Sequence, residues 1–369
     1  MSSEMVKLGD VINVHYGKAL KADQRVSDGS VHVFGSSGII GNHDKTLCSY
    51  PTIIIGRKGS VGAVTWAPDG GWIIDTAYYV EIKEHDKLDL RYLFHILSRV
   101  DLTKKTITTS IPGLNRDDLY DTSIKLPSFE EQKRIVELLD KATDICQKRE
   151  KSIRLADDFL RATFLEMFGD PIENPKRWDI ASLLEYGSFK NGMNFTKGES
   201  GSILKCLGVG DFKSLATITC MDNIGEIKLN TLPSDDYLLK DGDIVFVRSN
   251  GNKALVGRCL TIYPGKGKVT FSGFCIRYRI ENPSLLPEYL NFLFRTPSMK
   301  QQMLSGGQGA NIQNISQGTL SALRIPVPPL EKQLAFSKVV SFHSALIEKL
   351  DINTAKTENM FDSISQQYF

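Results

Sequence analysis

Short apolar runs alternate with turn residues through most of the chain. The runs are rich in β-branched and aromatic residues and are separated by Gly, Asn, Asp and Pro, which is typical of strands joined by turns. The clearest predicted strands are 52–55, 61–66, 72–74, 77–80, 243–247 and 274–280. Short helices are expected around 90–99 and 287–293. This pattern predicts β-rich globular domains with few helices.

A second pattern follows each β-rich stretch, in which apolar residues recur every three or four positions, as along the seam of a coiled coil. The seam residues of the first run are Ile135, Leu138, Ile145, Ile153 and Leu160. Those of the second run are Phe336, Val339, Leu346, Leu350 and Phe361. The first run spans about 37 residues, or roughly 55 Å as a helix, which is longer than a domain of this size can cover. We therefore expect the two helices to pair antiparallel, although packing of each on its own domain is the alternative.

The chain consists of two copies of one plan. The segment 124–132 (Ile-Lys-Leu-Pro-Ser-Phe-Glu-Glu-Gln) matches the segment 325–333 (Ile-Pro-Val-Pro-Pro-Leu-Glu-Lys-Gln). Two further matches, in the same order, are Tyr92-Leu93 with Tyr289-Leu290 and Gly17 with Gly192. Three ordered matches indicate a divergent internal duplication, and the growing offset between them indicates insertions in the second copy.

These patterns predict an α+β fold with two β-rich domains, related by pseudo-two-fold symmetry and joined by two long antiparallel coiled-coil helices. The expected segments are the first domain at 1–127, the first helix at 128–168, a linker at 169–178, the second domain at 179–328 and the second helix at 329–369. The linker carries Gly169 and two prolines, which end a helix and prevent its resumption.

Composition narrows the class of protein. No apolar run reaches the roughly 18 residues of a membrane span, so we expect no membrane partner. The six cysteines are scattered without a Cys-x-x-Cys pair, which argues against a zinc site or a disulfide framework and favours a reducing cytoplasm. The net charge is only +2, but residues 246–300 hold nine Lys or Arg and two Asp or Glu. This basic stretch is either a phosphate-contacting face or an ordinary solvated surface.

Catalytic motifs are largely missing from the sequence. An adenine methyltransferase needs an Asn/Asp-Pro-Pro-Tyr/Phe tetrad, and the nearest string, 326–330 (Pro-Val-Pro-Pro-Leu), lacks its polar and aromatic ends. There is no phosphate-binding loop, and the histidines show no metal-ligand spacing. Asp69, Glu81 and Lys83 fit the loose pattern of a metal-dependent nuclease. A stand-alone nuclease is therefore the alternative function. The simpler interpretation of Asp69 is that it is a turn residue without a catalytic role.

Several short motifs occur in a fixed order along the chain. They are Leu-Gly-Asp at 8–10, Gly-Arg-Lys-Gly-Ser-Val-Gly at 56–62, Asp-Thr-Ala-Tyr-Tyr at 75–79, Leu-Pro-Ser-Phe-Glu-Glu-Gln at 126–132 and Met-Phe-Gly-Asp-Pro at 167–171. Together with the duplication they resemble the DNA specificity subunits of Type I restriction-modification systems, across both halves of the chain. The resemblance implies two target recognition domains, each reading one half of a split double-stranded DNA site, with the helices as spacer. It also implies two modification subunits that bind S-adenosylmethionine and methylate adenine, and restriction subunits that use ATP and Mg²⁺. The chain itself would carry no cofactor and no catalytic residue.

DNA contact candidates are polar residues on glycine-rich tips, because base reading needs rigidly held polar side chains and phosphate contacts need Lys, Arg or backbone amides. The tip residues after an apolar strand are Arg57, Lys58 and Ser60 in the first copy and Arg248, Ser249, Asn250, Asn252 and Lys253 in the second. A second set comprises Ser36, Ser37, Thr108 and Ser110 in the first copy and Gln308, Asn311 and Gln313 in the second. The lysines that follow the first glycine of each copy are Lys18, Lys21, Lys190 and Lys197. The alternative is that these are hairpin turns with solvated charges, on a scaffold that no longer reads DNA.

Overall fold

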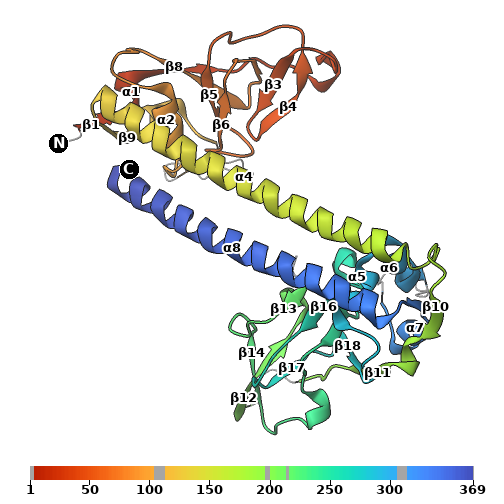
Figure 1. Cartoon of the computed structure of the whole chain (residues 1–369). Coiled ribbons are helices and arrows are strands. Elements are labelled where there is room, and N and C mark those ends of the chain that lie inside the picture. The colour runs from red at the N-terminus through yellow and green to blue at the C-terminus, as the bar shows by residue number, and fades with distance from the viewer. Residues whose placement is uncertain (1–3, 104–112, 196–199, 213–215, 306–313, 369) are drawn as a thin grey trace. The chain divides into compact units, whose positions relative to one another are not determined.

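The structure, a computed structural model, describes residues 4–103, 113–195, 200–212, 216–305 and 314–368, with side chains up to residue 350 (Figure 1). It divides into two compact units, residues 1–150 with 351–369 and residues 151–350. Each unit combines sheets and helices, and no helix of the described residues is long and apolar enough to span a membrane.

The described residues of unit 1 form three small sheets. Its sheets have the strand orders β1-β9, β2-β8-β5-β6 and β4-β3-β7. The strands are β1 (Glu4–Lys7), β2 (Ile12–Tyr16), β3 (Val31–Gly35), β4 (Gly38–His43), β5 (Thr52–Gly56), β6 (Val64–Ala67), β7 (Trp72–Ile73), β8 (Ala77–Ile82) and β9 (Ser123–Leu126). The short helices are α1 (Leu8–Val11), α2 (Leu90–Leu97) and α3 (Arg116–Tyr120). Leu93 and Ile96 of α2 are buried with Ile53 of the central strand β5 in the same core.

Unit 2 repeats this plan with additions. Its sheets have the orders β10-β19, β11-β18-β15-β16-β13 and β14-β12-β17. The strands are β10 (Asp179–Ser182), β11 (Gly187–Asn191), β12 (Ser202–Leu207), β13 (Thr217–Ile218), β14 (Glu226–Leu229), β15 (Asp243–Val247), β16 (Cys259–Ile262), β17 (Val269–Phe271), β18 (Cys275–Ile280) and β19 (Arg324–Val327). The short helices are α5 (Pro287–Arg295), α6 (Pro297–Ser305) and α7 (Gln317–Ser321).

The sheet topology confirms the internal duplication. The order β2-β8-β5-β6 of unit 1 is matched by β11-β18-β15-β16 in unit 2, and β4-β3-β7 is matched by β14-β12-β17. In both three-stranded sheets one pairing is antiparallel and the other parallel. Among the described strands, the extra edge strand β13 of unit 2 has no equivalent in unit 1. This insertion agrees with the growing sequence offset between the copies.

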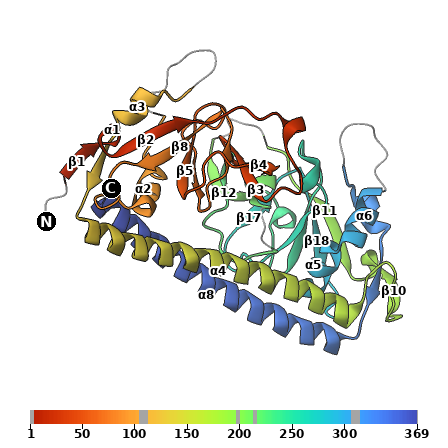
Figure 2. The same cartoon turned by 90° about the horizontal axis from the view of Figure 1, so that it is seen from above.

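Two long helices follow the β-rich regions. They are α4 (Phe129–Phe168) and α8 (Leu330–Tyr368). Within unit 2, the ring of Phe164 lies 5.4 Å from that of Phe336, and the carboxylate of Asp157 lies 3.0 Å from the imidazole of His343. Seven residues back along α4 thus correspond to seven residues forward along α8. The two helices are therefore antiparallel in this unit, as the sequence predicts (Figure 1, Figure 2).

The predicted seam residues have mixed environments. Ile135, Leu160 and Phe336 are buried, while Ile153, Val339 and Leu350 are half-buried. Leu138, Ile145 and Leu346 are exposed, and the side chain of Phe361 lies outside the described part. The buried stripe in the first half of α4 instead includes Leu139, which with Ile135 joins the core of unit 1. This part of the helix therefore packs on its own β-rich region. The core of unit 1 covers Leu139, the next residue along the helix, in place of the predicted Leu138.

Candidate nucleic-acid interface

In unit 1, the polar turn after β5 is held rigidly by backbone hydrogen bonds. All five residues of β5 are buried, so the turn stands on a fixed support. The amides of Arg57 and Lys58 donate to the Thr76 carbonyl at 2.9 and 3.1 Å, and the Leu114 amide donates to the Arg57 carbonyl at 3.0 Å. The chain returns through Gly62, whose φ of 76° favours glycine. The backbone of Arg57 is thus fixed from two sides.

Unit 2 builds the same turn after the buried strand β15. The Arg248 amide donates to the Phe274 carbonyl at 2.8 Å, and the Ile315 amide donates to the Arg248 carbonyl at 3.0 Å. Gly257 returns the chain with the same φ of 76°. Arg248 therefore occupies the position that Arg57 has in unit 1, and both arginines follow a strand with no exposed residue.

The other candidates of unit 1 have different surroundings. Ser36 belongs to the β3–β4 turn and lies beside the turn after β5, since a Cβ on Gly59 would be 3.4 Å from its hydroxyl oxygen. Among the described residues, the exposed candidates whose side chains donate to no protein acceptor are Lys18, Lys21, Ser37, Lys58 and Ser60. The structure brings Ser36 and Arg57 to neighbouring turns, and it places Lys18 at the end of β2.

Several candidates of unit 2 are already engaged. The ammonium of Lys190 lies 3.0 Å from the Asp236 carboxylate and 4.3 Å from the Tyr237 ring centroid. The side-chain oxygen of Asn250 accepts from the Asn252 amide at 2.7 Å, and that of Asn252 accepts from the Ala254 amide at 3.0 Å. Their amide nitrogens remain as potential donors to bases. Ser249 is half-buried and Lys253 is exposed.

Six candidates lie outside the described residues. They are Thr108, Ser110, Lys197, Gln308, Asn311 and Gln313. The described residues next to two of these segments pair with the rigid turns, because Gly113 forms a β-bridge with Lys58 and Asn314 forms one with Ser249. The equivalence of these bridges again follows the duplication.

The nuclease hypothesis is not supported. The carboxylate of Glu81 lies 2.8 Å from the His15 imidazole, and the Lys83 ammonium donates to the Gly9 carbonyl at 2.5 Å. Asp69 is exposed in the turn between β6 and β7. Across the described residues, no group of three His, Cys, Asp or Glu side chains is arranged to hold a metal ion. Two of the three proposed catalytic side chains are therefore engaged in structural contacts, and Asp69 is a turn residue.

A buried glutamine at the start of α4 ties the helix to unit 1. The side-chain oxygen of Gln132 accepts from the Asp89 amide at 2.8 Å. Its nitrogen donates to the carbonyls of Lys87 and Pro127 at 2.8 and 2.9 Å. Gln132 is fully buried, so this single side chain satisfies three backbone groups that would otherwise lack partners.

The second copy repeats this contact at the start of α8. The Gln333 oxygen accepts from the Leu286 amide at 2.9 Å, and its nitrogen donates to the Ser284 and Pro328 carbonyls at 3.0 and 2.8 Å. Gln333 is also fully buried. The matched Pro-x-x-Glu-x-Gln string thus marks, in each unit, a structural joint between the long helix and the β-rich region that precedes it, which we call the head. The sequence patterns did not predict this role.

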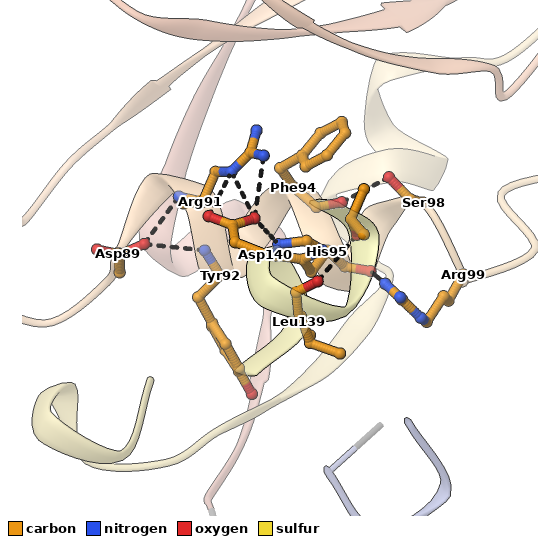
Figure 3. Close-up of polar contacts among 10 residues, drawn as sticks. Asp89, Arg91, Tyr92, Phe94, His95, Ser98, Arg99, Leu139 and Asp140 are labelled. Carbon is orange, nitrogen blue, oxygen red and sulfur yellow. Dashed lines mark hydrogen bonds and ion pairs between the residues drawn. The ribbon is translucent and has the colours of Figure 1, made fainter. Parts of the chain in front are cut away.

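A polar network adds a second joint in unit 1, between α2 and α4 (Figure 3). The carboxylate of Asp140 accepts from the Arg91 guanidinium at 3.1 and 3.2 Å and lies 2.8 Å from the imidazole of the buried His95. Burial holds the pKa of His95 below its ordinary value, because Asp140 offsets the loss of solvation only in part. Burial alone would raise the pKa of Asp140, but hydrogen bonds from Arg91 and His95 outweigh it and lower that pKa.

Four exposed apolar residues lie on the parts of the two long helices that belong to unit 2. Leu155 and Phe159 of α4 are 58% and 65% exposed, and Phe342 and Leu346 of α8 are 73% and 38% exposed. In the antiparallel register of the helices, Phe159 lies within one residue of the level of Phe342, and Leu155 within one residue of the level of Leu346. Exposed large apolar side chains such as these are candidates for contact with a partner. We call these four residues the helix patch.

The matched sheet orders and the duplicated polar turns define a class of proteins built from two equivalent β-rich units on one chain. Comparison with known proteins identifies the family. The family described as "Type I restriction modification DNA specificity domain" matches residues 2–155 and 201–359, which is most of the chain. The chain belongs to this family.

Individual relatives agree with the family match. The Type I restriction enzyme StySPI specificity subunit of Salmonella potsdam is 25% identical over 292 residues, covering 72% of this chain and 61% of that protein. The chain thus matches about three fifths of that relative's length. The MjaVIII specificity subunit of Methanocaldococcus jannaschii is 23% identical over 94% of this chain and 87% of its own length.

Solved structures share the fold. The S subunit of a Type I restriction-modification system from M. genitalium superposes with a TM-score of 0.65 at 16% identity, covering 100% of this chain and 96% of that one. A chain from a structural study of type I restriction-modification complex assembly gives a TM-score of 0.56 at 18% identity, covering 99% and 97%. At these identities the likeness concerns the fold alone.

Proposed function

We propose that this chain is the DNA specificity subunit of a Type I restriction-modification complex and reads a bipartite double-stranded target. The observation that carries the proposal is the duplicated rigid turn, in which Arg57 and Arg248 follow buried strands and have their backbones fixed in the same way. Arginine held in a fixed direction is the commonest reader of guanine in the major groove. Two diverged heads on one chain would read two different half-sites.

The long helices are proposed as the element that sets the gap between half-sites. One continuous helix, α4, contributes Ile135 to the core of unit 1 and Leu160 to the core of unit 2. The buried glutamines at the starts of α4 and α8 fix each helix to the head that precedes it. The length of a continuous helix is set by its number of residues, at 1.5 Å per residue. The gap between half-sites should accordingly be constant.

The helix patch supports assembly with partner subunits. We propose that two modification subunits dock on the long helices, bind S-adenosylmethionine and methylate adenine, and that restriction subunits bring the ATP- and Mg²⁺-dependent activity. In this proposal the chain is a non-catalytic adapter without a cofactor of its own, and it acts in the cytoplasm. The exposed Phe159 and Phe342 are the residues whose burial would contribute most to such a contact.

Selection from a random duplex library tests the proposal. The full chain, purified with its modification subunit, is mixed with the library, and the bound DNA is sequenced. Two specific blocks separated by an unspecific gap of constant length are expected. Bound DNA without sequence preference would overturn DNA reading and leave the pure-scaffold alternative.

A second measurement separates the adapter from a nuclease. The chain alone, incubated with plasmid and Mg²⁺, should leave the DNA intact. Cleavage that the Glu81→Ala variant abolishes would contradict the adapter function. A Glu84→Ala variant, at an exposed carboxylate three residues along the chain, is the matched control.

A further inference from the structure

Tyr16, the last residue of β2, gathers two arginines on the surface of unit 1. Its side chain is 49% exposed. The guanidinium carbon of Arg57 lies 5.1 Å from the ring centroid, and that of Arg116 lies 5.4 Å from it. The ring of Tyr78 packs edge-on against Tyr16 at 5.1 Å. Residues from three distant parts of the sequence thus form one cluster, which we call the Arg–Tyr cluster (Tyr16, Arg57 and Arg116).

Both guanidiniums are held in defined directions. Arg57 donates from Nη1 to the Asp75 carbonyl at 3.2 Å and also lies 5.9 Å from the Tyr78 ring centroid. Arg116 is the first residue of α3 and lies 5.9 Å from the Tyr120 ring centroid. Stacking on aromatic faces leaves the outward N–H groups of an arginine available for planar, two-point recognition.

The two arginines of the cluster are not ion-paired in the part of the chain that the structure describes, although Asp75, Asp117 and Asp118 are close to them in the sequence. Lys18 and Lys58, close in sequence to the cluster residues, are exposed and add to the positive charge. Two guanidiniums against one ring repel each other, and a partner that supplies paired acceptor atoms would relieve this repulsion.

Unit 2 has no such cluster at the equivalent positions. Asn191 is the last residue of β11, as Tyr16 is of β2, and Gln317 is the first residue of α7, as Arg116 is of α3. With Arg248 they provide one guanidinium, two amides and no ring. The two heads therefore present different chemistry on the same scaffold.

We propose that the Arg–Tyr cluster is a DNA contact of the first head alone, in which the two guanidiniums bind paired acceptors on duplex DNA. Those acceptors are either O6 and N7 of a guanine or the oxygens of a phosphate. The inference rests on the proposed function and adds to it two residues, Tyr16 and Arg116, and an asymmetry between the heads.

The test measures binding of the full chain, in complex with its modification subunit, to the duplex obtained by selection. Tyr16→Leu removes the ring, Tyr16→Phe retains it, and Arg116→Ala removes one cation. Lys45→Ala is the control for loss of one exposed positive charge in the same head. Tyr16→Leu and Arg116→Ala should each bind about tenfold more weakly, whereas Tyr16→Phe and Lys45→Ala should bind as the wild type does. Equal melting temperatures verify that the variants are folded.

Scrambled duplexes identify the acceptor. If Arg116 contacts a base, the loss caused by Arg116→Ala disappears when one particular half-site is scrambled and persists when the other is. If it contacts a phosphate, the loss persists on both, with a weaker salt dependence. Gln317→Ala should weaken recognition of the opposite half-site. If Tyr16→Leu and Arg116→Ala both bind with wild-type affinity and sequence preference is intact, the role of the cluster in DNA binding is overturned and the proposed function stands. If the wild-type complex itself shows no sequence preference, the proposed function is overturned as well.

Discussion

Replacing Gln333 by Leu should loosen the joint between α8 and the preceding head. Leucine fills a similar volume but cannot bond the Leu286 amide or the Ser284 and Pro328 carbonyls. Each lost hydrogen bond costs about 1 kcal/mol net, and more where the remaining backbone group stays buried. The free energy of local opening should therefore fall by about 3 kcal/mol, which corresponds to about a hundredfold increase in the opening constant.

Hydrogen exchange measured by mass spectrometry locates this effect. Amides of the head in unit 2 should exchange about a hundredfold faster in Gln333→Leu, while those of the head in unit 1 should keep their rates. Gln132→Leu should produce the reverse pattern, since its three bonds lie in unit 1. Gln147→Leu, at an exposed position of α4, is the control. A change below about fivefold, equivalent to roughly 1 kcal/mol, or an equal change in both units, would refute the reasoning.

The remaining predictions concern the partner surface, a titrating pair and a buried ion pair. Phe342→Glu should abolish co-purification with the modification subunit at unchanged melting temperature, whereas Ser344→Glu should not; retained co-purification would contradict docking on the helix patch. Because the pKa of His95 lies below its ordinary 6.5 in the folded chain, the unfolded chain binds the proton first as the pH falls. Stability of unit 1 in urea should thus decrease below about pH 6.5, and His95→Phe should flatten this slope; an identical slope in the variant would exclude His95 as its source. Asp243→Asn removes the charge partner of the Arg279 guanidinium, which lies 2.6 Å from the carboxylate. Urea unfolding should show that unit 2 is destabilised by about 3 kcal/mol. A loss under about 1 kcal/mol would show that the ion pair is not needed for the stability of unit 2.

The sequence predicted most of the architecture because its signals are local or repeated. The matched segments 124–132 and 325–333 indicated the duplication, and the apolar runs indicated the central strands such as β5 and β15. The seam spacing indicated two long helices. The spacing predicted that Leu138 is buried, whereas the structure buries Leu139 and exposes Leu138. The head against which the helix packs decides which face of the helix is covered.

The candidate site was harder to predict, because its contacts join distant residues. The turn residues Arg57 and Arg248 were found from a polar tip after an apolar strand. Tyr16 and Arg116 were not, because a ring and a cation a hundred positions apart give no joint pattern in one sequence. Gln132 was noticed as part of a match, but its role depends on backbone groups in a loop about forty residues upstream.

Mapping of methylated adenines tests the central claim most directly. The chain and its modification subunit are expressed in a bacterium without adenine methylation of its own, and the genome is sequenced by a method that detects N6-methyladenine. The account predicts methylation within one motif of two specific parts separated by a gap of constant length. A single contiguous motif, or two parts at variable distance, would contradict the model of two heads joined by rigid helices.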